Sequence, residues 1–236
     1  MIGYHFTGDK LRNGEPIPPI GEWIEYKGRI VPCKSGLHMS EHPFDALHSA
    51  PGCLLHQVEL EGDIVPHGDP VNDHVGRRRK IIATIDATDL LRAFARWCAL
   101  QVIDLWNAPA IVREYLETGD ETKRDAARTA AWAVASDTTM ATTSGAALAA
   151  VIASSALVAV IASSAWDAAS DAARDASDAS GAASGAVWTS VWAAARALEW
   201  DAASDASDAT LAAQRSRFAA MVEEAFRAAA AAGGTD

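Results

Sequence analysis

The sequence predicts an α+β fold in which a small N-terminal β-rich module is followed by an Ala-rich α-helical array. Two features of the composition predict this division. All nine prolines lie at or before Pro109, and all seven histidines lie at or before His74. Alanine fills 43 of the 108 positions from 126 to 233 but only nine of the first 125. Because alanine has the highest helix propensity, the second half of the chain is expected to be helical.

Length and charge limit the function classes. The 236 residues are enough for one large domain or two small ones, and the formal net charge of -11 is strongly acidic. We therefore expect no direct binding of nucleic acid, since the chain has no basic surplus to neutralise phosphates. The three cysteines, Cys33, Cys53 and Cys98, are an odd number, and no signal peptide is recognised at the start. These features favour the reducing cytoplasm and no disulfide framework.

Residues 1–86 are predicted to form the α+β module. Short apolar and β-branched runs bounded by Gly and Pro are typical of strands. They predict strands over residues 2–6, 23–26, 29–33, 53–60 and 80–85. Pro43, at the first turn of the segment 41–47, predicts a short helix there.

Residues 87–121 are predicted to be linking helices. Thr88 or Asp89 can cap the first helix, in which apolar residues recur at spacings of three and four. Pro109 interrupts this pattern and is expected to begin a second helix, which stops at the segment 118–121.

Residues 122–236 contain a repeat. The pattern Trp-x-x-Ala-Ser-Asp occurs at 132–137, 166–171 and 200–205, so its tryptophans are 34 residues apart both times. A period of this size corresponds to one helical hairpin per repeat, which buries its apolar face only by stacking on its neighbours. The sequence thus predicts an array of 34-residue helical hairpins. Low-complexity expansion of Ala, Ser and Asp without structural meaning is the alternative.

The segment 138–166 carries no charged residue. Its length and hydropathy would permit a membrane span. However, it keeps the 34-residue register, contains two Ser-Ser pairs and has no flanking cationic cluster, which favours a buried helix in the middle of the array. We expect no membrane insertion, and the alternative stays open.

The sequence offers few candidates for chemistry. Thiolate and imidazole are ligands that zinc prefers, and four such residues fall close together: Cys33, His38, His42 and His48. Their spacing matches no zinc-finger or ribbon pattern, so we interpret them as a His-rich surface loop and expect neither a metal nor another cofactor. No phosphate loop, dinucleotide fingerprint or Gly-x-Ser-x-Gly motif occurs.

The repeat region supplies the candidate binding residues. Its tryptophans are expected to fill the space that alanine leaves, and its aspartates to form an acidic surface that suits a basic protein partner. The residues concerned are Trp132, Trp166, Trp200, Asp171, Asp175 and Asp205. Self-association or capture of a protein partner is therefore the predicted function.

The segment 17–94 resembles an uncharacterised domain family of bacteriophage and bacterial proteins. The likeness lies in the stretch 21–28 (Gly-Glu-Trp-Ile-Glu-Tyr-Lys-Gly) and in the segment 33–47, which begins Cys-Lys-Ser-Gly-Leu-His. Val58-Glu-Leu-Glu-Gly62 and the strand 80–85 complete it. Ala-rich tails punctuated by Trp follow the domain in several members. The resemblance implies a phage or prophage origin, hence the host cytoplasm, and brings no established activity.

A second stretch is similar to ADP-ribosyltransferase-type folds. Tyr4-His5-Phe6-Thr7, the Gly36-Leu37-His38 segment and the strand 54–60 follow the order of elements found there. This resemblance implies that His5 and Thr7 help to hold NAD and that Glu59 is the catalytic acid. The middle tyrosine of that family has no counterpart here.

We therefore expect a non-enzymatic binding or assembly protein. The first alternative is an ADP-ribosyltransferase-like enzyme that uses NAD through the N-terminal module. The second is a phage inhibitor of a host defence protein.

Overall fold

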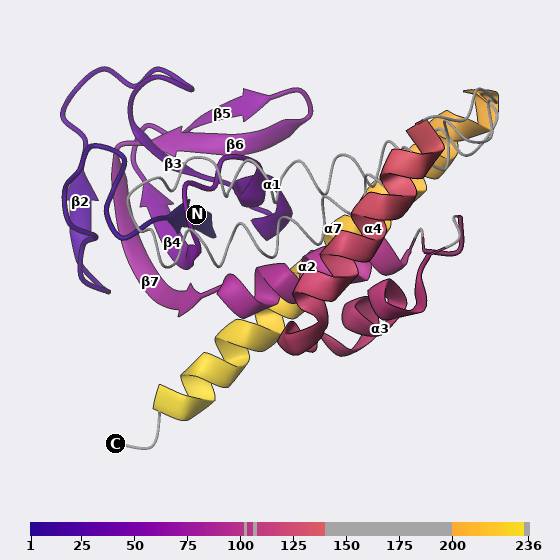
Figure 1. Cartoon of the computed structure of the whole chain (residues 1–236). Coiled ribbons are helices and arrows are strands. Elements are labelled where there is room, and N and C mark those ends of the chain that lie inside the picture. Colours follow the sequence, from indigo (N-terminus) through magenta and orange to yellow (C-terminus); the bar gives the residue numbers. More distant parts are fainter. Residues whose placement is uncertain (102, 106–107, 140–199, 234–236) are drawn as a thin grey trace. The chain divides into compact units, whose positions relative to one another are not determined.

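The computed structural model describes residues 1–101, 103–105, 108–139 and 200–233. They belong to two compact units. The first, called the head below, combines Met1–Leu90 with Phe218–Asp236, and the second, the helical unit, comprises Leu91–Arg217. Figure 1 shows the strands of the head in indigo to magenta and the end of its last helix in yellow.

The larger sheet of the head has four antiparallel strands. They are β1 (Ile2–Thr7), β4 (Leu54–Glu61), β7 (Arg78–Asp86) and β2 (Trp23–Glu25), in the order β1-β4-β7-β2. Successive residues of a strand point to opposite faces, so the register assigns each side chain to one face of the sheet. β7 contains one extra residue opposite the Gln57/Val58 step of β4, where the register shifts.

The smaller sheet has three strands. β6 (Val71–Gly76) lies between β3 (Leu37–Met39) and β5 (Val65–Gly68), and both pairings are antiparallel. A bridge between Tyr4 and Ser40 joins the end of β3 to β1 of the larger sheet. The smaller sheet therefore continues from the free edge of β1.

Apolar side chains from both sheets form one core cluster. Met39 comes from β3, Val58 and Leu60 come from β4, and Ile81 comes from β7. Gly3 permits this packing, because a Cβ atom there would lie 2.5 Å from the carbonyl oxygen of Ser40 and 2.6 Å from Met39. The backbone of β1 thus approaches β3 more closely than any side chain would allow.

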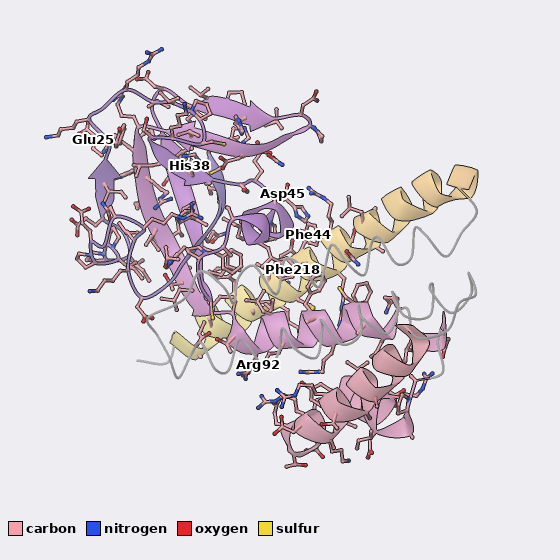
Figure 2. The ribbon with its side chains drawn as sticks, turned by 45° about the horizontal axis from the view of Figure 1, so that its top comes forward. Glu25, His38, Phe44, Asp45, Arg92 and Phe218 are labelled. Atoms are coloured by element: carbon pink, nitrogen blue, oxygen red, sulfur yellow. The ribbon has the colours of Figure 1, made fainter. Side chains whose placement is uncertain are left out.

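Two helical segments belong to the head. The helix α1 (Pro43–His48) begins with Pro43, and the Nδ1 of His42 accepts a hydrogen bond from the backbone N–H of Phe44. The second segment is the end of α7 (Trp200–Gly233). The Phe218 ring of α7 meets the Phe44 ring of α1 edge-on, with centroids 6.2 Å apart (Figure 2).

A further contact fixes α7 to β1. The Phe226 ring lies 6.3 Å from the ring of Tyr4. Burial and the negative charge of Glu223 both raise the pKa of Tyr4. Phe218 and Val222, one turn apart on α7, are fully buried. One face of α7 therefore packs on the head through residues four positions apart.

The helical unit contains the remaining elements. They are most of α2 (Thr88–Leu100), η1 (Ile103–Leu105), α3 (Ala110–Thr118), η2 (Glu121–Lys123), α4 (Arg124–Thr139) and the first half of α7. Pro109 precedes α3, and Gly119 ends it in the left-handed conformation with φ 67°. This is the common arrangement of Pro at the start and Gly at the end of a helix.

The structure confirms the predicted α+β character and the presence of strands in the N-terminal part, and it shows that these strands pair antiparallel. It also confirms the helices expected at Pro43, Thr88 and Pro109. The strand predicted over 29–33 is wrong: a bridge between Val31 and Ser35 closes a turn, in which Cys33 has a left-handed φ of 59°. Two of the three hexapeptide copies lie in helices, at 132–137 in α4 and at 200–205 in α7. The middle copy, and with it most of the predicted array, lies outside the described residues.

None of the described helices is long and apolar enough to cross a bilayer. Nearly all of the uncharged segment 138–166 lies outside the described residues.

Candidate functional site

Three strands of the head carry a row of polar side chains on one face of the larger sheet. The register pairs His5 of β1 with His56 of β4, and His56 with Thr84 of β7. The Nε2 of His56 lies 2.7 Å from the Oγ1 of Thr7, and its Nδ1 lies 2.8 Å from the Oγ1 of Thr84. A neutral imidazole donates through one nitrogen and accepts through the other, so both ring nitrogens of His56 are satisfied.

This row stabilises the sheet and does not perform nucleophilic catalysis. Burial, with a smaller contribution from the charge of Arg79, lowers the pKa of His56 to about 4, so its ring is neutral at pH 7. The His56–Thr7 pair resembles a base and its nucleophile. However, Thr7 is only 2% exposed and His56 only 1%, so substrate has no access to the hydroxyl. The hydrogen bonds therefore hold β1, β4 and β7 in register.

Arg79 lies on the same face, since it pairs with Leu60, which is four residues from His56 along β4. It is 5% exposed, and its Nη1 donates a hydrogen bond of 2.6 Å to the backbone carbonyl oxygen of His38. The guanidinium thus spans from β7 of the larger sheet to β3 of the smaller one. Burial lowers the pKa of Arg79 to about 10, which leaves the side chain protonated at neutral pH.

His5 lies within the field of several basic groups. Burial lowers its pKa well below the ordinary value, and the charges of Arg79, His56, His38 and Arg12 lower it further. We call these five side chains the basic cluster. His38 also contacts a carboxylate, since its Nδ1 lies 2.8 Å from the Oδ2 of Asp73.

The three residues suggested by the transferase resemblance are not brought together. His5 and Thr7 share one face of β1, whereas Glu59 is three residues from His56 on β4 and therefore points to the opposite face. Lys80 lies 2.7 Å from Glu59 and donates the hydrogen bond that is the main cause of the lowered pKa of this carboxyl group. A single NAD molecule on one face of the sheet would not contact all three residues.

Three of the four residues weighed as zinc ligands have separate partners. The Sγ of Cys33, at an exposed turn, lies 3.5 Å from the Nδ1 of His67, while His38 contacts Asp73 and His42 caps α1. The side chain of His48 lies outside the described residues. Among the described side chains, no group of three or more His, Cys, Asp or Glu residues could hold a metal ion.

The repeat residues are placed only in part. Trp132 lies in α4, and Trp200 and Asp205 lie in α7. Trp166, Asp171 and Asp175 lie outside the described residues. The structure therefore gives the backbone conformation at three of these six positions and no geometry for the predicted acidic surface.

Sequence reasoning missed the roles of Arg79 and His56. The sequence contains the basic run 77–80. Because side chains alternate between the two faces of a strand, this run could have been predicted to place Arg79 on the face opposite to Arg78 and Lys80. Arg78 and Lys80 lie over the ring of Trp23, with the charged groups 4.7 and 4.6 Å from the ring centroid, whereas Arg79 points the other way. One basic residue of the run therefore enters the interior of the head.

Comparisons with known proteins found no matching family model, no matching curated protein and no matching solved structure.

Proposed function

We propose that the protein is a non-enzymatic binding and assembly protein. In this proposal the Ala-rich helical region associates with itself or captures a protein partner, and the head is attached to its end. The observation that carries the proposal is α7, a single helix of 34 residues that begins at the third copy of the hexapeptide and ends on the head. The first residues of this helix therefore belong to the repeat region and its last residues to the head.

Further observations support this proposal. The copies of the hexapeptide at 132–137 and 200–205 are helical, as an array of helical hairpins requires. The net charge of -11 suits a basic protein partner. Resemblance to a phage and bacterial domain favours action in the cytoplasm of a host cell, where a host defence protein is one class of partner.

The test is the oligomeric state of the full chain, measured by sedimentation velocity over a range of concentrations. We expect a mass that is a multiple of 24.8 kDa and that falls towards the monomer in Trp200→Ala. Trp23→Ala is the matched control, because it removes the same side chain from an edge strand of the head. A wild-type chain that stays monomeric at all concentrations would exclude self-association.

The NAD-dependent transferase is the competing function, and it is tested by calorimetric titration with NAD in phosphate buffer. We expect no saturable binding, because Glu59 lies on the face of the sheet opposite to His5 and Thr7. Saturable binding that disappears in His5→Ala would favour the transferase over the assembly protein.

A further inference from the structure

The turn that precedes β3 carries a cysteine at its tip. The backbone N–H groups of Val31 and Ser35 each donate to the carbonyl oxygen of the other residue, and the Ser35 hydroxyl donates to the carbonyl oxygen of Arg29. Between these bonds, Cys33 is exposed and has a left-handed φ of 59°, which is uncommon for a residue with a side chain. The hydrogen bonds of the turn therefore hold this thiol in one position on the surface of the head.

The same turn lies against one face of the smaller sheet. Gly36 permits this approach, because a Cβ atom there would lie 2.4 Å from the Cγ1 of Val75 in β6. His67 of β5 pairs with Asp73, which is two residues from Val75 on β6, so the side chain of His67 is on the face that the turn covers. The thiol and the imidazole are 34 residues apart in sequence and meet on this face.

The two side chains are close enough for proton transfer. The Sγ of Cys33 lies 3.5 Å from the Nδ1 of His67 and 3.6 Å from its Nε2, so a basic nitrogen is near the sulfur in either neutral tautomer. A thiol beside a base is the arrangement of an activated sulfur nucleophile. Unlike the buried His56–Thr7 pair, both residues are exposed, so a reactant has access to the sulfur.

The number of groups that a reaction needs selects among the reactions of a thiolate. Acyl transfer also requires donors that stabilise an oxyanion. Thiol–disulfide exchange requires only a thiolate and an accessible disulfide, because the negative charge passes from one sulfur to another. Cys33 and His67 by themselves are therefore sufficient for exchange.

We propose that Cys33 and His67 form a site of thiol–disulfide exchange for low-molecular-weight disulfides. His67 removes the proton of the thiol, and the sulfur of Cys33 attacks one sulfur of the disulfide. The new S–S bond forms as the original one breaks, and the departing thiolate takes the proton from His67. The products are a mixed disulfide at Cys33 and one free thiol, so the disulfide is the only oxidant. This site is separate from the assembly role of the helical region.

The experiment adds excess glutathione disulfide to the reduced full chain at pH 7, folded and in urea, and follows each cysteine over time by peptide mass spectrometry. Cys53, which is half-buried, and Cys98 are internal controls; burial raises the pKa of Cys98 to about 12. In the folded chain we expect Cys33 to react about tenfold faster than either. In urea, Cys53 and Cys98 should react faster, whereas Cys33 should react about fivefold more slowly, because unfolding separates it from His67.

His67→Gln tests the base, since the amide of glutamine does not take up a proton at pH 7. Val65→Ala is the matched control, because it shortens another exposed side chain on the same face of β5. We expect the rate at Cys33 to fall about fivefold or more in His67→Gln and to stay within twofold in Val65→Ala. Equal rates at Cys33 in His67→Gln and wild type would overturn the proposal. If His67→Gln does not fold, the wild-type chain decides: a Cys33 that reacts no faster when folded than in urea is not activated by its surroundings, and the proposal is then wrong.

Discussion

Truncation of Phe218 should detach the C-terminal helix from the head. Phe218 is fully buried, and its ring meets Phe44 edge-on at 6.2 Å. A phenylalanine buries roughly 150–250 Å², which at about 25 cal/mol per Å² corresponds to ~4–6 kcal/mol. This is an upper bound, because the alanine keeps part of the contact and the unfolded chain is already partly compact. We therefore expect Phe218→Ala to lower the free energy of unfolding of the head by about 3–4 kcal/mol.

The measurement combines urea denaturation with hydrogen–deuterium exchange of β1 and β4. Exchange in these strands should accelerate in Phe218→Ala, because loss of the helix uncovers the face of the sheet that contains Tyr4. Arg217→Ala is the matched control, since this neighbouring residue is exposed and its replacement should change stability by less than about 0.5 kcal/mol. Unchanged exchange and an unchanged denaturation midpoint in Phe218→Ala would show that α7 does not stabilise the head.

Three further predictions concern pH, packing and the repeat. The pKa of His56 is about 4 in the folded protein and near 6.5 in the unfolded chain, so the unfolded state binds the extra proton between these pH values. The free energy of unfolding should therefore fall by about 3 kcal/mol as the pH drops from 6.5 to 4. Denaturation at each pH measures this change. Gly3→Ala should cost about 1–3 kcal/mol in a thermal melt, because its Cβ would lie 2.5 Å from a backbone oxygen, whereas Gly8→Ala, with 3.8 Å to the nearest atom, should be nearly neutral. Trp200→Ala should cost about 3 kcal/mol and Asp175→Ser almost nothing, and equal melting temperatures for both would contradict a packed array.

Local patterns predicted the strands and helices where the signal was periodic. β1, β4 and β7 follow from alternating or β-branched runs, and α2 follows from apolar residues at spacings of three and four. The hairpin formed by β5 and β6 was not predicted. Its sequence contains Pro66, Gly68 and Pro70, which are typical of loops, and its pairing depends on the neighbouring strand β3.

The candidate site could not be predicted from local patterns. His5 and His56 are 51 residues apart in sequence and become cross-strand neighbours only through the register of β1 and β4. The sequence analysis placed Phe218 and Phe226 within the helical array. Their spacing indicates an apolar face of a helix, but it does not indicate which other element this face packs against. Their contacts with Phe44 and Tyr4 join the two ends of the chain, and the pairing of such distant residues is not encoded in any periodicity.

The position of α7 also determines the order of events during synthesis of the chain. The ribosome completes the strands of the head with residue 86 but still has to add roughly 130 residues before Phe218 appears. At typical bacterial or eukaryotic rates this interval lasts on the order of ten seconds. Throughout it, the apolar face around Tyr4 lacks its helix and is open to aggregation with other nascent chains. A chaperone that covers this face until translation ends would therefore raise the yield of native protein. A chaperone that binds only after release from the ribosome would not prevent aggregation during this interval.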